Sequence, residues 1–285
     1  MFGVGIAVDG VLDVFCDWIY GKLIEFFNDF FTNMNMMGAE LFDLDWIQVI
    51  LLFFSWFAWA LYAVGLVVAV FDAAIEAQKG KGNMQDVALN ILKGFFAVSL
   101  FTVVPINLYV FCISLSTNLT NAIAGLTGSP GELGMVTKFA FGSIEHLGGN
   151  VINSIVFVVL IGYSVVKTFF ANLKRGGILL IMIATGSLYM FSVPRGYSDG
   201  FTNWCKQVAA LCLTAFLQTI ILVAGLVTFN TSFLLGIGLM LSSTEVPRIA
   251  GQFGMDTSTK FNAMSAVYSA QSAINLARTV TSKVK

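Results

Sequence analysis

The chain contains long runs of apolar residues without a charged side chain, and these runs restrict the folds it can adopt. Residues 46–71 hold no Asp, Glu, Lys or Arg, and residues 207–244 form a second such run. A helix rising about 1.5 Å per residue needs about 20 apolar residues to cross the hydrocarbon core of a bilayer. Only 11% of the 285 residues are charged, against roughly 25% in soluble domains. The sequence therefore predicts an all-α integral membrane protein.

The apolar runs predict about five transmembrane helices within a polytopic domain at residues 46–244. The five spans are residues 46–71, 94–115, 147–166, 176–193 and 207–227. Pro105 lies inside the second span and predicts a kink, and Pro194 ends the fourth. Polar residues from Thr228 to Ser232 interrupt the last run, so residues 233–241 are predicted to form a short hydrophobic segment at the membrane or at a subunit contact.

The two ends of the chain carry opposite charge. Residues 1–45 contain eight of the 16 acidic residues, and their apolar residues recur at spacings of three and four. This pattern predicts an acidic amphipathic helix at the N-terminus that lies in the membrane interface or packs on a partner. Residues 245–285 are predicted to form a helical tail with a basic end, which suits packing on another helix.

Lysine and arginine near the span ends predict the orientation, because cytoplasmic loops of membrane proteins are enriched in both. The connections after the first and third spans carry three cations each, namely Lys79, Lys81 and Lys93, and Lys167, Lys174 and Arg175. The connections after the second and fourth spans carry Lys138, and Arg195 with Lys206. We therefore expect a multi-pass protein of the cell membrane with its N-terminus outside and its basic C-terminal tail in the cytoplasm.

Three groups of residues are candidates for contacts. Lys167, Lys174 and Arg175 form a basic cytoplasmic loop that could meet anionic lipid, nucleic acid or an acidic partner, or could simply determine orientation. Turn and helix-packing residues are Pro194, Arg195, Gly196 and Trp204. Small residues that allow close helix approach are Gly176, Gly177 and Gly186.

Motifs for energy coupling and catalysis are missing from the sequence. The Lys79-Gly-Lys-Gly stretch lacks the Gly-Lys-Ser/Thr ending of a phosphate-binding loop. The four cysteines form no metal-ligand spacing, and His146 has no nucleophile near it in sequence. The five predicted spans hold no Asp, Glu, Lys, Arg or His, which disfavours proton-coupled transport. We expect a protein without catalytic activity or cofactor that takes its driving force from a partner.

Residues 172–225 read NLKRGGILLIMIATGSLYMFSVPRGYSDGFTNWCKQVAALCLTAFLQTIILVAG. This block closely resembles the TrbL-like polytopic membrane component of type IV secretion systems, in the form encoded by conjugative elements of Gram-positive bacteria. The resemblance extends more loosely over the whole chain. It implies an inner component of a DNA-transfer channel with about five spans, an outside N-terminus and an inside C-terminus.

The same resemblance implies partners. It predicts a homo-oligomer around a translocation path, contacts with the ATPases of the secretion system and with a cell-wall-side subunit, and passage of single-stranded DNA with its attached relaxase. We therefore favour a conjugation channel or scaffold subunit. Two alternatives stay open: a small-molecule transporter subunit, which should have an ionisable or broken-helix site at mid-depth, and a structural anchor for a soluble ATPase, which should be monomeric without a pore.

Overall fold

The computed structural model describes residues 18, 22, 37–80, 84–125, 151–229 and 231–252, and within these ranges the chain consists of helices joined by short turns. Most of the predicted N-terminal amphipathic helix, most of the connection after the second predicted span, and the tail beyond Gln252 lie outside the described residues. The predictions for those segments therefore stay predictions.

The helices follow one another along the chain with few interruptions. The first part contains α2 (Met37–Glu40), the 3-10 helix η1 (Leu41–Asp43), α3 (Asp45–Gln78), α4 (Met84–Leu100) and α5 (Val103–Gly125). The second part contains α7 (Val151–Gly186), the 3-10 helices η2 (Ser187–Phe191) and η3 (Val193–Arg195), α8 (Asp199–Phe229), α9 (Phe233–Ser243) and α10 (Val246–Gln252).

Four stretches of the described chain are long and apolar enough to cross a membrane. They are Asp45–Gln78, Val103–Ile123, Val159–Arg195 and Asp199–Phe229, and the shorter apolar helix Phe233–Ser243 accompanies them. The prediction of an all-α membrane protein is thereby confirmed. The helix Phe233–Ser243 also matches the short hydrophobic segment predicted at residues 233–241.

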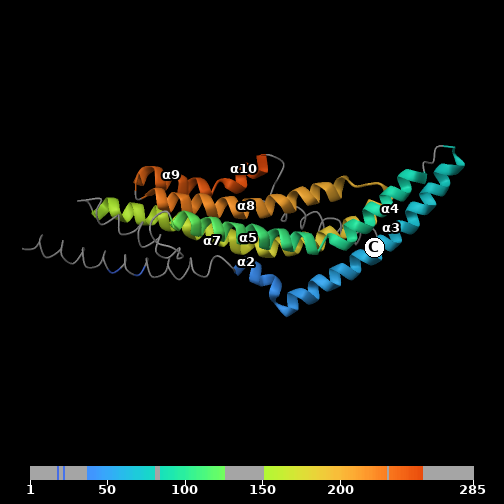
Figure 1. The fold of residues 1–285 in the computed structure, drawn as a ribbon, viewed down its shortest axis with the longest axis horizontal. Helices are drawn as coiled ribbons and strands as arrows, with labels where there is room; N and C mark the ends of the chain where they lie inside the picture. Colours follow the sequence, from blue (N-terminus) through green and yellow to red (C-terminus); the bar gives the residue numbers. More distant parts are fainter. Residues whose placement is uncertain are drawn as a thin grey trace, which may run out of the picture.

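The helices form an elongated bundle (Figure 1). Helices α5, α7 and α8 run along its long axis, with α8 packed against both of the others. Helices α3 and α4 form a hairpin that extends beyond the bundle at one end, and η2 and η3 pack between its arms. At the opposite end α8 turns back into α9, which packs along it.

The prediction of a loop between the third and fourth spans is wrong. Helix α7 runs unbroken from Val151 to Gly186 and so joins residues 147–166 and 176–193 into one element. No proline interrupts this stretch. Lys167, Lys174 and Arg175 all lie within the helix. The Nζ of Lys167 lies 5.3 Å from the ring centroid of Tyr163, and Arg175 binds polar groups inside the bundle. The three charged residues predict a loop, but in the structure they lie on the continuous helix α7.

The predicted second span is interrupted near Pro105, where the prediction placed a kink. Helix α4 ends at Leu100, a turn at Phe101 and Thr102 follows, and α5 begins at Val103. Pro105 has no N–H to donate to the Phe101 carbonyl, and its ring would collide with that carbonyl in a straight helix. The kink expected from Pro105 is therefore confirmed, one turn before the proline itself.

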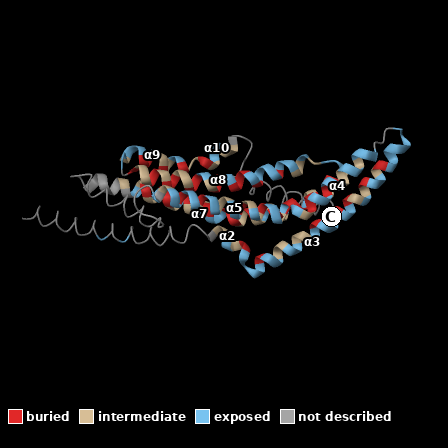
Figure 2. Ribbon diagram, viewed as in Figure 1, coloured by how far each residue is buried: buried red, intermediate tan, exposed pale blue. Residues whose placement is uncertain are grey.

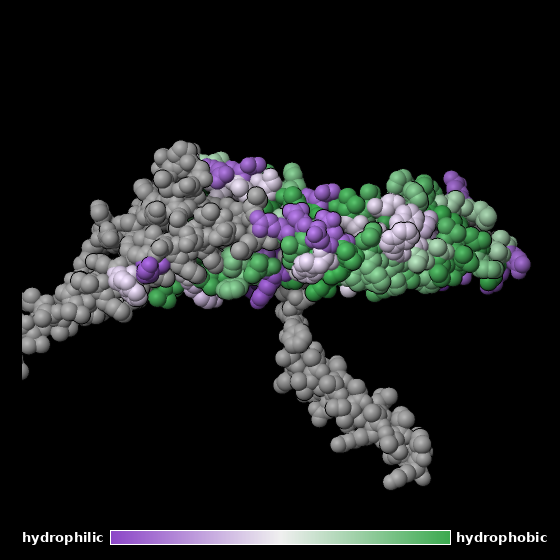
Figure 3. Space-filling model, turned by 90° about the horizontal axis from the view of Figure 1, so that it is seen from below, coloured by the Kyte–Doolittle hydropathy of each residue, from purple (hydrophilic) through white to green (hydrophobic). Residues whose placement is uncertain are grey.

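Large apolar side chains cover much of the outside of the bundle. On α3 the exposed fractions of Phe53, Trp56 and Phe71 are 62%, 72% and 65%, and pale blue dominates this helix in Figure 2. Figure 3 shows hydrophobic residues over most of the visible surface of the α3–α4 hairpin. A soluble protein rarely exposes so large an apolar patch, whereas a bilayer solvates it.

Candidate functional site

A buried polar cluster joins α7 to α8 near the middle of the bundle. Asn172 and Arg175 lie three residues apart on α7, and Gln218 and Thr219 are adjacent on α8. The arginine donates from Nη1 to Asn172 Oδ1 and from Nη2 to Gln218 Oε1. The Asn172 amide donates to Thr219 Oγ1 at 3.1 Å, and that hydroxyl donates to the Ala215 carbonyl at 3.1 Å. The cluster therefore satisfies its members through a continuous chain of hydrogen bonds.

The arginine in this cluster is a buried cation that pairs with no carboxylate of the described residues. Arg175 is only 4% exposed, and among the described residues no Asp or Glu lies within ion-pair distance of its guanidinium. Removing a charge from water is costly unless charge or strong hydrogen bonds replace the water. Here two amide oxygens do so, which makes the positions of Asn172 and Gln218 conditions for burying Arg175.

The cluster continues as a stripe of buried polar residues along α7. Ser164, Thr168, Asn172 and Arg175 follow spacings of four, four and three, and all are buried. The Thr168 and Ser243 hydroxyls lie 3.3 Å apart, so the stripe also contacts α9. The stripe therefore holds α7, α8 and α9 together by hydrogen bonds, as small polar residues do between membrane helices.

Helix α5 brings further buried hydroxyl groups to the bundle interior. Tyr109, Ser116 and Thr120 are buried, and their hydroxyl groups have no hydrogen-bond partner among the described residues. The Tyr109 hydroxyl lies close to Gly38 of α2, where a Cβ atom would come within 2.4 Å of it. These groups give the interior of the chain free hydrogen-bonding capacity that ordered water could satisfy.

The predicted basic loop residues are not brought together. Arg175 points into the bundle, whereas Lys167 and Lys174 are exposed on α7. The prediction that Arg175 contacts a cytoplasmic partner is wrong because its guanidinium is already bound to α8. Lys167 and Lys174 lie seven residues apart and so share one face of the helix. Contact of these two lysines with lipid, nucleic acid or an acidic protein stays a prediction.

The predicted turn residues lie together where α7 meets the α3–α4 hairpin. Arg195 Nη2 lies 3.3 Å from Asp72 Oδ2, and its guanidinium carbon is 5.2 Å and 5.5 Å from the ring centroids of Phe191 and Tyr197. Gly196 has φ 91°, a left-handed conformation that favours glycine. The turn is thus held both by its own backbone and by a contact with α3.

The contact between Arg195 and Asp72 also corrects the predicted arrangement of the ends. Asp72 lies in α3 seven residues before Lys79, at the end of the bundle that carries the connection from α3 to α4. Arg195 and Lys79 had been expected on opposite sides of the membrane. The structure instead places Arg195 beside Asp72, at the same end of the bundle as that connection, because α7 crosses the bundle once rather than twice.

Pro194 and Trp204 pack the turn against its neighbours. Pro194 is buried, and Cβ atoms on Gly65 and Gly94 would lie 3.0 Å and 3.3 Å from its ring. The Trp204 indole donates to the Met182 carbonyl at 2.7 Å and lies so close to Gly186 that a Cβ there would be 2.7 Å from the ring. Gly186 therefore serves as a close-contact position between α7 and α8.

The other two predicted glycines differ from each other. A Cβ on Gly176 would lie 2.8 Å from the Gly38 carbonyl oxygen, so α2 crosses α7 at this point, whereas a Cβ on Gly177 would meet nothing within 4 Å. Gly176→Ala should lower the free energy of unfolding by about 1–3 kcal/mol, as overpacking against backbone does. Gly177→Ala, its matched control, should raise it by about 0.5–1 kcal/mol through helix propensity. Thermal unfolding of both variants in nanodiscs checks the prediction, and equal shifts would contradict it.

Comparisons with known proteins identify one family. A family model described as conjugal transfer protein TrbL matches residues 1–285. The search of curated proteins found no match, and neither did the search of solved structures. Within the described ranges, no group of three or more His, Cys, Asp or Glu side chains could hold a metal ion.

Proposed function

The chain belongs to the TrbL family of conjugal transfer proteins, and from this premise we propose that it is a channel or scaffold subunit of a conjugative type IV secretion system. In this role it forms part of the path by which single-stranded DNA with its attached relaxase leaves the donor cell. The observation that carries the proposal is the family match over the full 285 residues. It is supported by a bundle of helices long and apolar enough to cross a membrane.

The chain acts passively and takes its driving force from partners. Its sequence has no phosphate-binding loop. The buried cation Arg175 is bound by the side-chain amides of Asn172 and Gln218, which joins α7 to α8 and stabilises the bundle. Ion-coupled transporters instead commonly place carboxylates at mid-depth in the membrane. The ATPases of the secretion system supply the energy, and the chain itself catalyses no reaction.

The distribution of cations supports one orientation in the cell membrane. Lys79 and Lys81 lie at the connection from α3 to α4 and Arg195 lies in the turn before α8, while Lys93 and Lys206 lie within the first ten residues of α4 and α8. The connection from α5 to α7, at the opposite end, carries Lys138 alone. By the positive-inside rule the end with Lys79 is cytoplasmic and α3 enters from outside. Helix α8 then ends at the outer side, and α9, 11 residues and so about 17 Å long, turns back along α8 over part of its length.

Several copies of the chain surround the translocation path. The polar stripe of α7 is buried within one chain and is not available to line an open path, so we place the aqueous path between copies and other subunits. The outer connection between α5 and α7 is available to cell-wall-side subunits, the cytoplasmic end with Lys79 and Lys81 is available to the ATPases, and the exposed Lys167 and Lys174 are available to passing DNA.

Deletion of the gene from a donor strain tests the proposal. Transfer of the conjugative element should become undetectable while nicking of its DNA by the relaxase continues, and a copy of the gene supplied in trans should restore transfer. Normal transfer from the deletion strain would refute the proposal. In the complemented donor, crosslinking followed by capture of the chain should recover the transferred DNA strand. If deletion abolishes transfer but no DNA is recovered with the chain from a transferring donor, the chain would be a scaffold outside the path.

A further inference from the structure

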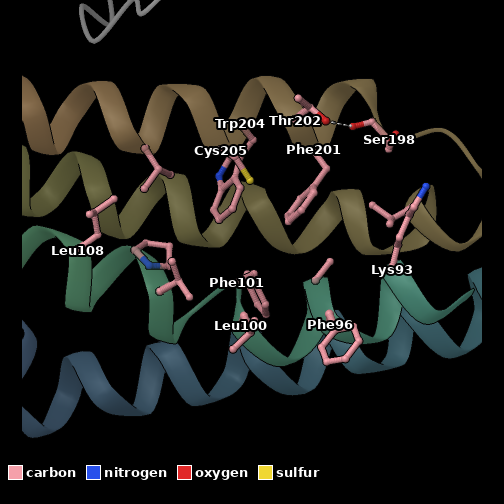
Figure 4. Close-up of a pocket in the computed structure, with 15 residues that line it drawn as sticks. Lys93, Phe96, Leu100, Phe101, Leu108, Ser198, Phe201, Thr202, Trp204 and Cys205 are labelled. Atoms are coloured by element: carbon pink, nitrogen blue, oxygen red, sulfur yellow. Dashed lines mark hydrogen bonds between the residues drawn. The ribbon is translucent and has the colours of Figure 1, made fainter. Parts of the chain in front are cut away.

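A groove on the side of the bundle has the form of a ligand site. It lies between α4 and α5 on one side and α8 on the other, with a volume of about 620 Å³, within the range of roughly 300–1,000 Å³ that ligand pockets occupy. Its walls are apolar: Phe96, Leu100 and Phe101 come from the α4 side, and Phe201, Trp204 and Cys205 come from α8 (Figure 4).

One end of the groove is polar. Lys93 and Ser198 lie at this end, and Leu108 lies at the other (Figure 4). The Thr202 hydroxyl donates to the Ser198 carbonyl at 3.0 Å, whereas the Lys93 ammonium is exposed and has no hydrogen-bond or ion-pair partner among the described residues. Asp199, the next residue along α8, does not line the groove. The mouth therefore offers an ammonium group and the side chain of a serine to a ligand.

The length of the groove matches one leaflet of a bilayer. Its lining on α8 runs from Ser198 to Val208, ten residue steps and so about 15 Å of helix at about 1.5 Å per residue. This is half of the roughly 30 Å hydrocarbon thickness. The polar end lies at the level of Arg195 and Asp72, where charged residues mark the membrane surface. A ligand in the groove would thus have its polar part at the surface and its apolar part inside one leaflet.

The shape and lining of the groove suit an extended hydrocarbon chain, because its mostly apolar lining follows about 15 Å of α8. Extended hydrocarbon chains are thinner than a helix and can follow the apolar wall. The cationic end then selects the headgroup.

We propose that this groove binds one phospholipid with an anionic headgroup, whose phosphate lies at Lys93 and Ser198 and whose acyl chains lie against Phe101, Phe201 and Trp204. The proposal rests on the cytoplasmic placement of this end, because anionic lipids give the cytoplasmic leaflet its negative surface potential. It does not depend on the role in DNA transfer. The bound lipid fills the groove where α4 and the first turns of α5 face α8, and so supports the position of the α3–α4 hairpin against the bundle.

Lipid retention by the purified full-length chain tests the proposal. The chain is reconstituted in nanodiscs of phosphatidylglycerol and phosphatidylcholine in equal amounts, extracted in mild detergent and analysed by native mass spectrometry. Wild type should keep one phosphatidylglycerol per chain. Lys93→Gln should lower the preference for phosphatidylglycerol about fivefold, the factor that one lysine at an anionic surface provides. Lys206→Gln, on α8 but outside the lining, should leave it unchanged.

A second variant tests occupation of the groove separately from charge. Cys205 lines the groove and is exposed, so Cys205→Phe fills the groove without entering the packed core. This variant should lose retention of both lipids while its thermal unfolding stays close to that of wild type. Equal retention of the two lipids by wild type, or equal retention by wild type and Cys205→Phe, would overturn the proposal. A change in oligomer mass without a change in bound lipid would overturn it too, since the groove would then be a contact between copies.

Discussion

A chain carrying Arg175→Glu is expected to lose about 3–5 kcal/mol of stability, the cost of leaving a buried charge uncompensated. The guanidinium donates to Asn172 Oδ1 and Gln218 Oε1 in wild type. A glutamate at this position would place a carboxylate beside two acceptor oxygens in the same buried space, with no cation among the described residues to pair with it. Thermal unfolding of the reconstituted protein, followed by circular dichroism, should show a much lower midpoint or no cooperative transition.

Two further variants make the expectation for Arg175 specific. Lys174→Glu reverses a charge on the adjacent residue, which is exposed, and should change stability by less than about 1 kcal/mol. The exchange Arg175→Gln with Gln218→Arg keeps one cation and one amide in the cluster and should recover part of the loss. If Lys174→Glu and Arg175→Glu are equally damaging, the effect of charge is one of membrane insertion and the buried cluster is not its cause.

The cluster can also be removed as a unit. Replacing Asn172, Arg175 and Gln218 together by leucine or methionine leaves no polar group unpaired, and such replacements of buried ionic groups are often neutral or stabilising. We expect the triple variant to be more stable than Arg175→Glu. A triple variant that folds but fails to support DNA transfer would show that the cluster serves transport as well as packing.

Gly236→Leu is the second change with a large expected effect. Helices α8 and α9 approach so closely that a Cβ on Gly236 would lie 2.4 Å from Phe229 Cα and 2.6 Å from its backbone nitrogen. Backbone atoms cannot move aside as a side chain can, so the variant should detach α9 from α8 and cost about 3 kcal/mol or more. Cysteine crosslinking between α8 and α9 should fail in this variant.

Gly238→Leu is the matched control for Gly236→Leu. Gly238 lies two residues further along the same helix, and a Cβ there would meet nothing within 4 Å. The added leucine side chain should therefore leave both the crosslink and the unfolding midpoint near their wild-type values. Loss of the crosslink in both variants would mean that helix propensity or insertion, rather than close backbone contact, governs the α8–α9 pair.

Hydropathy predicted the membrane class and Pro105 itself predicted the break near it, because both depend on local properties of the sequence. The fold of α7 was not predictable in the same way. Lys167, Lys174 and Arg175 looked like the end of one span and the start of another, and only the tertiary partners Asn172 and Gln218 explain how a cation lies inside a continuous helix. The number of crossings, and with it the side of Arg195, depended on that one point.

The spacing of the polar residues in the sequence does indicate a continuous helix. Ser164, Thr168, Asn172 and Arg175 recur at helical spacing, which indicates one polar face rather than a loop. By contrast, nothing in the sequence distinguishes Gly176 from Gly177, although only the first lies against another backbone. Such differences depend on which direction a neighbouring helix comes from, and that direction is a property of the whole fold.

The unbroken course of α7 determines how far the molecule reaches. Its 36 residues, at about 1.5 Å each, make a rod of about 54 Å, which would fit within a hydrocarbon layer of roughly 30 Å only at a tilt of about 56°. Transmembrane helices tilt by up to roughly 40°, and at that angle the rod still spans about 41 Å along the membrane normal. Part of α7 therefore extends beyond the hydrocarbon layer into the headgroup region, and a force applied to that part would act on one continuous helix.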